Sequence, residues 1–325
     1  MVGRSSGGSE REHVPRRDDA SSPSRHGRRS VLVPLPPVAD DPDHAAESAL
    51  PMARTVAARL GVPVTLLSVV STAPTFNPLT QMTMPAPAAG AAPVADAEAQ
   101  LARLAAVLQP SPVETAVRTG AAAEEIRTAI VERAAPVLVL CSQTRTGLDG
   151  LLYGSITGEL VRSATCSVLV VRGTQPATPA DAVPLHTVVV PLDQSSLAEQ
   201  ALPHALAVLG PADLHLHLLY VLEPPSAAVL VAGTRDEATI RHYLEAMAQP
   251  LRSQGYDVTT EVRSGTPAEE IARVAGEQGA HLIALATHGW GGVRPMVLGS
   301  VAERLLRIAP VPLLFVHPAD STGIA

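Results

Sequence analysis

Short runs of Val, Leu and Ile alternate with amphipathic stretches along most of this chain. From residue 186 onward the apolar runs predict strands, and the stretches between them have the three- and four-residue spacing of helices. The predicted strands are 187–192, 214–221, 257–262, 281–286 and 312–316, and the predicted helices are 196–209, 236–254, 267–278 and 300–309. Nearly continuous apolar strands that alternate with helices indicate a parallel sheet covered on both faces.

Three helix starts carry a capping-box pattern, in which a Ser or Thr is followed three residues later by Glu. The pairs are Ser196 with Glu199, Thr266 with Glu269 and Ser300 with Glu303. Pro267 stands at a predicted first helical position, where its missing N–H costs nothing. We therefore expect helices to begin at these three places.

The strand and helix pattern occurs twice in the chain. The segment 118–127, Arg-Thr-Gly-Ala-Ala-Ala-Glu-Glu-Ile-Arg, matches 263–272, Arg-Ser-Gly-Thr-Pro-Ala-Glu-Glu-Ile-Ala, at an offset of 145 residues (118 to 263). The same offset aligns Gly154-Ser155 with Gly299-Ser300 and the last apolar runs of the two copies. At the front of each copy, 31–35 matches 188–192 at a larger offset, and the extra residues lie mainly in 71–95, which predicts a long Pro/Ala/Thr-rich loop.

The repeat predicts two tandem α/β domains, each a doubly wound unit with a five-stranded parallel sheet. The expected organisation is a disordered Arg-rich tail (1–29), a first domain (30–172), a Pro/Ala-rich linker (173–185), a second domain (186–317) and a short tail (318–325). The last strands of the two domains are plausible sheet edges.

The amino-acid composition excludes some mechanisms and argues against some classes of partner. All 24 cationic side chains are Arg, and the absence of Lys excludes a P-loop and a Schiff-base mechanism. The net charge of −7 argues against a general nucleic-acid binder. Cys141 and Cys166 make no disulfide framework, which fits a reducing, cytoplasmic location. The polar start of the chain predicts no secretory signal, and no apolar run is long enough to predict a membrane span.

The loop over residues 286–300 is glycine-rich and lies between a predicted strand and a predicted helix. Such a loop can hold an anion, because main-chain N–H groups and the helix dipole both favour negative charge there. In a doubly wound sheet, ligands bind at the carboxyl ends of the strands where the strand order reverses. Asp193, which follows the first strand of the second copy, would face the loop and could accept hydrogen bonds from ribose hydroxyls.

These features resemble the universal stress protein family. Its ATP-binding members carry two glycines separated by two residues, then nine residues, then Gly-Ser or Gly-Thr; this chain has Ala286-Thr-His-Gly289 and then Gly299-Ser300 at that spacing. Only the first glycine departs, and Ala is small. The resemblance covers about 30–172 and 186–317. It implies a Rossmann-like fold of the adenine nucleotide alpha hydrolase type that binds ATP, with a divalent ion such as Mg²⁺ carried on the nucleotide.

By this resemblance the second domain carries the nucleotide site. The implied site residues are Pro191, Leu192, Asp193, Val221, Ala286, His288, Gly289, Gly292, Arg294, Gly299, Ser300 and Val301. Asp193 would contact the ribose or the adenine edge, Val221 would line the adenine pocket, and the glycine loop with Ser300 would hold the phosphates. Arg294 could add a cation to them.

The resemblance also implies how the two copies associate. Last strands in this family pair across a dimer interface, so we expect the last strands of the two domains to pair within the chain as a pseudo-dimer. A homo-dimer of chains stays open.

The first copy departs from the family pattern at the positions that matter. Pro36 stands where Asp193 stands, and Gln143 and Thr144 replace the His-Gly step. A β-branched Thr cannot readily replace a glycine wrapped around a phosphate. We therefore expect a degenerate site; the alternative is that Asp40 or Asp41 substitutes for Asp193.

Other candidate residues favour ordinary roles. His215 and His217 point to one face of a predicted strand without a third metal ligand in view, so structural packing is expected. His288 could be a base, but the sequence supplies no Ser-His-Asp arrangement and no catalytic residues are assigned. The favoured function is a regulatory, stress-response nucleotide-binding module with no strong catalysis. The alternatives are a nucleotide-free interaction or scaffold protein, a slow ATPase and an adenylating enzyme.

Overall fold

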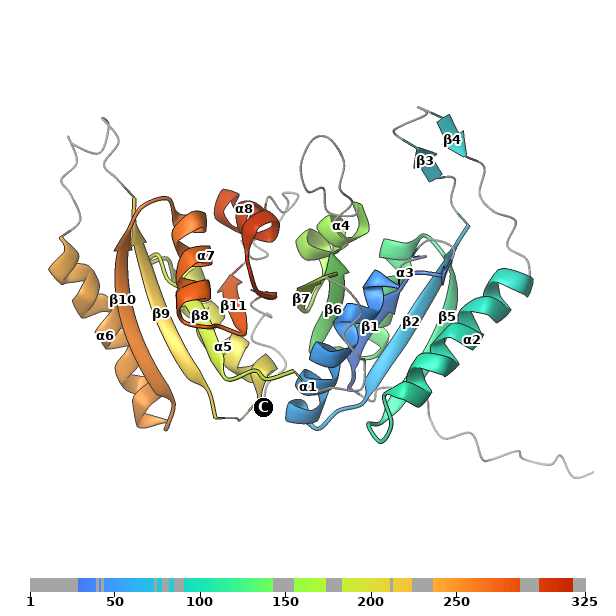
Figure 1. Ribbon diagram of the computed structural model, residues 1–325, viewed down its shortest axis with the longest axis horizontal. Helices are drawn as coiled ribbons and strands as arrows, with labels where there is room; N and C mark the ends of the chain where they lie inside the picture. Colours follow the sequence, from blue (N-terminus) through green and yellow to red (C-terminus); the bar gives the residue numbers. More distant parts are fainter. Residues whose placement is uncertain are drawn as a thin grey trace, which may run out of the picture.

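The computed structural model describes residues 29–38, 41, 44–72, 75–77, 82–84, 91–142, 155–173, 183–210, 213–223, 236–286 and 298–317. Its central feature is one ten-stranded sheet, in the order β10-β9-β8-β11-β12-β7-β6-β1-β2-β5 (Figure 1). The first half contributes β1 (Val31–Leu35), β2 (Val64–Ser71), β5 (Val113–Gly120), β6 (Val137–Ser142) and β7 (Ser167–Arg172). The second half contributes β8 (Thr187–Pro191), β9 (His215–Leu222), β10 (Asp257–Ser264), β11 (Leu282–Ala286) and β12 (Leu313–Val316).

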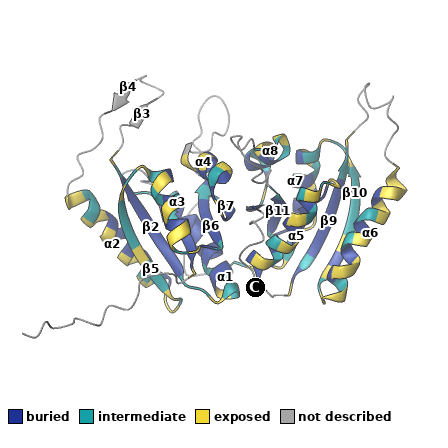
Figure 2. Cartoon of the chain, turned by 180° about the vertical axis from the view of Figure 1, so that it is seen from behind, coloured by how far each residue is buried: buried dark blue, intermediate teal, exposed yellow. Residues whose placement is uncertain are grey.

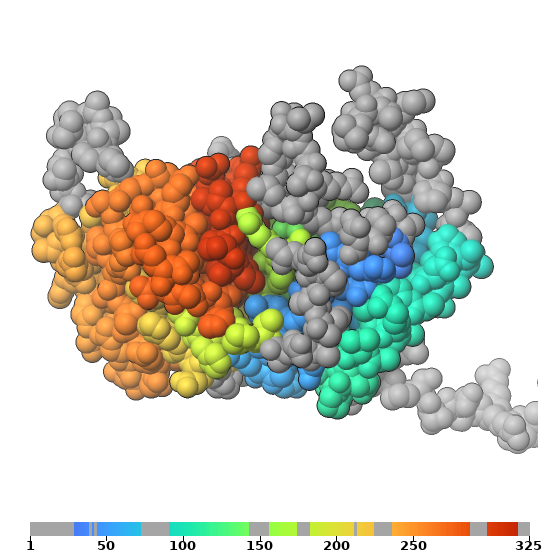
Figure 3. Space-filling model, in the orientation of Figure 1, coloured from blue at the N-terminus to red at the C-terminus, as the bar shows by residue number. Residues whose placement is uncertain are grey.

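Helices cover both faces of this sheet. One face carries the short 3₁₀ helix η2 (Ala45–Ala49), α1 (Leu50–Leu60), α2 (Ala91–Val107), α5 (Ser196–Leu209) and α6 (Glu237–Ser253). The other face carries α3 (Ala122–Glu132), α4 (Ser155–Ser163), α7 (Pro267–Glu277) and α8 (Ser300–Ile308). Figure 2 shows the buried strands between these half-exposed layers, and Figure 3 shows α7 and α8, in orange and red, forming one outer surface of the second half. Among the described helices, none is both long and apolar enough to cross a membrane.

The alternation of side chains along each strand explains the two cores. In β8, Val188 and Val190 pack into the core under α5 and α6, whereas Val189 packs into the core under α7 and α8. All three are essentially inaccessible to solvent. A strand buried on both faces reads as a continuous apolar run, and the predicted strand and helix bounds of the second half agree with the structure to within two residues.

Within each half, the first strand lies between the second and the fourth. β8 pairs in parallel with β9 and β11, and β1 pairs in parallel with β2 and β6. The halves meet where β12 pairs with β7 in the antiparallel direction, with Phe315 opposite Val168. The two five-stranded units therefore share a single continuous sheet, and the buried Phe315 lies at its centre.

The prediction of a long loop over 71–95 is wrong in part. β3 (Thr75–Asn77) and β4 (Met82–Met84) pair as a small antiparallel sheet, and α2 begins at Ala91. A three-residue strand changes the average composition of a Pro- and Ala-rich segment very little, so the composition alone predicts a loop there. This small sheet is separate from the ten-stranded sheet.

Two of the three predicted helix caps are displaced by one residue. Ser195, not Ser196, is the N-cap of α5; its backbone is extended and its Oγ accepts a hydrogen bond from the main-chain amide three residues on, at 3.1 Å. Gly299, not Ser300, is the N-cap of α8, without a side-chain cap. Thr266 is the N-cap of α7, but its side chain makes no capping bond. The backbone conformation decides the cap, and neighbouring Ser residues leave that choice open in the sequence.

Candidate functional site

The strand order places two predicted site segments side by side at the carboxyl edge of the second half. β8 leads into α5 on one face of the sheet, and the next strand in the sheet, β11, leads toward α8 on the other face. β8 and β11 are parallel with Leu282 opposite Val188, so continuing this register brings Ala286 opposite Leu192. This is the reversal of strand order at which doubly wound sheets bind ligands.

Asp193 is presented on a tightly fixed turn. The amide of Leu192 donates to the oxygen of Leu219 at 2.8 Å, which anchors the turn to β9. The Asp193 side chain is exposed, and its Oδ1 accepts a hydrogen bond from the amide of Ser195 at 2.9 Å. Gln194 between them has a φ of 65°, in the left-handed region that costs energy for a residue with a side chain. The turn therefore holds an exposed carboxylate in place at the edge of the sheet.

The beginning of α8 offers main-chain donors on the opposite face. Within the described part of the chain no side chain caps its N-terminus, and the partly buried Gly299 and the exposed Ser300 lie there. The first amides of a helix have no partners within the helix, and they carry partial positive charge. The nearby Glu303 is paired with Arg307 at 3.1 Å, so part of its negative charge is offset. This helix end can accept an anionic group.

The remaining predicted site residues fall into two groups. His288, Gly289, Gly292 and Arg294 lie outside the described residues. Pro191, the last residue of β8, and Val221, near the end of β9, are partly buried at the carboxyl ends of adjacent strands. Val301 is partly buried and packs against the core under α7 and α8, as Val221 does. The structure thus brings the described predicted residues to one edge of the second half.

The corresponding edge of the first half differs in its carboxylate. Asp41 is only 4% exposed, and its two oxygens accept hydrogen bonds from the amides of Ala45 and Ala46, at 3.0 and 2.8 Å. These bonds cap η2, so both oxygens of Asp41 serve the helix start. The alternative that Asp41 replaces Asp193 is therefore not supported by this geometry, and Asp40 lies outside the described residues. Pro36, at the position of Asp193, supplies no acidic group.

A residue that the sequence analysis did not select lies against the Asp193 turn. Tyr243, on α6, has a buried hydroxyl that faces the carboxylate of Glu199, the main chain of Gln194 and the carboxylate of Asp193. Burial, followed by the negative charge of Glu199, raises the pKa of Tyr243. Its position on the inner side of an amphipathic helix predicts burial only, so no sequence pattern pointed to this neighbourhood.

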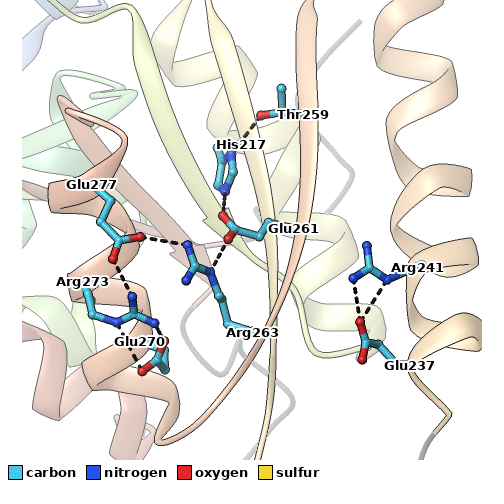
Figure 4. A network of polar contacts seen from close by, with 9 residues as sticks. All are labelled: His217, Glu237, Arg241, Thr259, Glu261, Arg263, Glu270, Arg273 and Glu277. Atoms are coloured by element: carbon cyan, nitrogen blue, oxygen red, sulfur yellow. Dashed lines mark hydrogen bonds and ion pairs between the residues drawn. The ribbon is translucent and has the colours of Figure 1, made fainter.

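His217 belongs to a polar network elsewhere on the second half (Figure 4). Its Nε2 lies 2.8 Å from Glu261 and its Nδ1 lies 2.8 Å from the hydroxyl of Thr259. Glu261 also pairs with Arg263, which reaches Glu277 on α7 at 2.8 Å. Burial lowers the pKa of His217, although Glu261 opposes this effect. Both ring nitrogens are thus engaged between β9 and β10, which favours a structural role.

Comparison with known proteins gives two consecutive matches to one family model. The model described as the universal stress protein family matches residues 37–172 and again 184–317. A universal stress protein of Methanocaldococcus jannaschii is 29% identical over 138 residues, which cover 40% of this chain and 80% of that protein. One of Mycobacterium tuberculosis is 27% identical over 191 residues, covering 57% of this chain and 62% of that protein.

A solved structure supports the tandem fold. The crystal structure of a universal stress protein from Archaeoglobus fulgidus has a TM-score of 0.63 and 20% identity. The likeness covers 90% of this chain and 99% of that one, so it includes both halves. At this level of identity it supports the arrangement of the fold.

Proposed function

The chain belongs to the universal stress protein family, and we propose that its second half binds ATP at the carboxyl edge of β8 and β11. In this proposal the second half is a domain over 186–317, joined by a linker over 173–185 to a first domain over 30–172. Asp193 accepts hydrogen bonds from the ribose or the adenine edge, and the amides of Gly299, Ser300 and Val301 hold phosphate oxygens. Binding regulates the protein in a stress response, and turnover of ATP is not required.

One contrast between the halves carries this proposal. The exposed Asp193 carboxylate is held on a fixed turn after β8, at the edge where the neighbouring β11 leads toward α8, whereas both oxygens of the buried Asp41 carboxylate accept hydrogen bonds from amides at the start of η2. An exposed carboxylate on one side of this edge and main-chain donors on the other suit a ligand with hydroxyls at one end and phosphates at the other. We infer that the first half serves as a structural partner with a degenerate site.

The proposal treats Mg²⁺ as part of the ligand. Among the described residues, no group of three His, Cys, Asp or Glu side chains could hold a metal ion. ATP binds Mg²⁺ through its phosphates, and protein sites commonly add few ligands to it. The chain's own contribution would then be main-chain donors at α8, with Mg²⁺ entering on the nucleotide.

Titration calorimetry of the full chain with ATP and Mg²⁺ tests the proposal. We expect one ATP per chain, and we expect Asp193→Ala to weaken binding about tenfold, equivalent to about 1.4 kcal/mol. Asp257→Ala is the matched control, because Asp257 is also exposed but lies at the opposite end of its strand. No heat at millimolar ATP would favour a nucleotide-free interaction protein, and an unchanged affinity of Asp193→Ala would remove Asp193 from the site.

A further inference from the structure

Histidines stand at the amino-terminal ends of three adjacent strands in the second half. His186 precedes β8, His215 begins β9 and His281 precedes β11, and β8 lies between the other two strands. By strand register and repeat offset, the corresponding residues of the first half are Arg29, Pro63 and Pro136. These histidines are therefore specific to the second half, and they lie at the opposite end of its strands from the proposed ATP site.

His281 and Thr187 form a closed pair of hydrogen bonds where β8 and β11 begin to run together. The amide of His281 donates to the main-chain oxygen of Thr187 at 2.9 Å, and the amide of Thr187 donates to Nδ1 of His281 at 3.2 Å. Both residues are partly buried. An amide N–H can only donate, so Nδ1 must keep its lone pair and the ring proton must lie on Nε2. The bond to Nδ1 therefore forms only while His281 is neutral.

The first half holds the chain just before this pair. The hydroxyl of Thr55, on α1, donates to the main-chain oxygen of Val183 at 3.0 Å. The guanidinium of Arg59, one turn further along α1, donates to the main-chain oxygen of Leu185. The start of β8 is thus fixed by α1 of the first half on one side and by His281 on the other.

The charges near the His281 ring are positive. The His186 ring lies edge-on to it, with the ring centroids 6.0 Å apart, and Arg59 adds a permanent positive charge from α1. Burial lowers the pKa of His281, and His186 and Arg59 lower it further. Within the described part of the chain, these two are the charged groups that act on the ring. Protonation of His281 therefore brings like charges together and also removes the acceptor of the Thr187 amide.

We propose that the pair of His281 and Thr187 is an acid-sensitive switch at the junction of the two halves: neutral His281 holds the first residue of β8, and protonated His281 releases it. A protonated imidazole carries an N–H on both nitrogens and cannot accept from the amide. Because the folded pKa lies below the ordinary value of about 6.5, the contact is complete above about pH 7 and is lost on acidification. The switch does not depend on the ATP site.

The ring nitrogens of His281 report its state directly in the parent protein. NMR of the ¹⁵N-labelled chain at about pH 7.5 should show a proton on Nε2 and none on Nδ1, and acidification should protonate both nitrogens. A proton on Nδ1 at about pH 7.5 would overturn the proposal. This measurement needs no variant, so it is decisive even where a substitution at this position prevents folding.

Amide hydrogen exchange, corrected for the intrinsic effect of pH on the exchange rate, measures the release. Protection of the Thr187 amide should fall about fivefold between about pH 7.5 and 5, because its acceptor is lost. The control is the amide of Val31, at the start of β1, which donates to the main-chain oxygen of Pro63 at 2.9 Å. A carbonyl acceptor does not titrate, so protection of Val31 should change less than twofold. Equal protection of Thr187 at both pH values would contradict the switch.

Two variants show whether His281 is the responsible group. His281→Asn removes the titration but keeps an acceptor, because the Asn Oδ1 can take the place of Nδ1. Protection of Thr187 in this variant should change less than twofold over the same pH range. His186→Asn is the matched control, since His186 is exposed and its Nδ1 lies 3.4 Å from the main-chain oxygen of Asp213. It should keep the fivefold response. A parent-like response in His281→Asn, or a lost response in His186→Asn, would assign the effect to another group.

Discussion

Arg172 and His317 occupy equivalent positions in the two halves, each at the end of its half's last strand. Arg172 donates a hydrogen bond from Nη2 to the main-chain oxygen of Arg307, in the last turn of α8. His317 is only 7% exposed and faces the main chain of Val161 and Cys166, around the end of α4. The repeat offset of 145 residues relates 172 to 317. Each half therefore contacts the other through the residue at the end of its last strand. One of these residues is an Arg, and the other is a His whose ring can titrate.

Replacing Arg172 with Ala should destabilise the fold. A charged donor on the main-chain oxygens at a helix end contributes about 1–2 kcal/mol, through the hydrogen bond and the helix dipole. Arg241→Ala is the control, because Arg241 pairs with Glu237 along the exposed side of α6, where such pairs contribute at most about 0.5 kcal/mol. Urea denaturation monitored by circular dichroism measures both. Equal losses for the two variants would contradict the role of Arg172 in joining the halves.

His317 should make the stability depend on pH. Burial lowers its pKa in the folded protein, whereas in the unfolded chain the pKa is about 6.5. As the pH falls below about 6.5, the unfolded chain takes up a proton that the folded protein does not, so the free energy of unfolding decreases until the folded His317 titrates. The contribution of His317 is therefore complete above about pH 7 and is lost on acidification.

Removing the titratable ring at position 317 tests this assignment. Both ring nitrogens lack a well-formed hydrogen bond, so His317→Phe removes no such bond and should reduce the loss of stability between about pH 7.5 and 5. Denaturant titrations at several pH values give the comparison. His217 and His281, whose pKa values burial also lowers, keep some pH dependence in the variant. A pH profile identical to that of the parent protein would exclude His317 as a contributor.

The start of α5 allows a comparison of two neighbouring serines. Ser195 caps the helix, whereas Ser196 is the exposed first helical residue. Ser195→Ala should lower the free energy of unfolding by about 1 kcal/mol, since one helix amide loses its acceptor. Ser196→Ala should change it by less than about 0.5 kcal/mol. Thermal denaturation of both variants decides the register of the cap, and a larger loss for Ser196→Ala would restore the capping box expected from the sequence.

The two cysteines should react slowly in the folded protein. Burial raises the pKa of Cys141 and of Cys166 to about 12 in each case, so only a minute fraction is thiolate near pH 8. Cys166 is buried, whereas Cys141 is partly exposed. We expect iodoacetamide to modify neither within minutes in the native state, and both after denaturation, as mass spectrometry would show. Rapid native labelling of Cys166 would contradict its burial.

The local pattern of apolar and polar residues was sufficient to predict the strands and helices of the second half and their order along the chain. Apolar runs such as 187–192 and the repeated segment 118–127 define strands, helices and two copies without any tertiary information. The sequence also predicted that Asp193 faces the 286–300 loop, because parallel strands that alternate with helices restrict which strand ends can be neighbours. The structure agrees on the strand neighbours, and the binding role of these residues stays a prediction.

Short segments and single positions were harder to predict. The small sheet of β3 and β4 lies in a segment whose composition suggests a loop, and the cap of α5 is shifted from Ser196 to Ser195. Both depend on backbone conformation at a few residues, for which propensities are weak and neighbouring residues nearly equivalent.

The repeat, the parallel αβ architecture and the strand ends that meet could all be predicted from the amino-acid sequence, because they depend on the period of apolar side chains and on chain connectivity. Three other features became visible in the folded chain: the carboxylate of Asp41 binds amides at the start of a helix, Tyr243 lies near the Asp193 turn, and Arg172 and His317 each contact the other half. Each of these depends on how two elements pack together. The direction of a side chain across such a contact follows from the packed core of the whole chain, which no local pattern records.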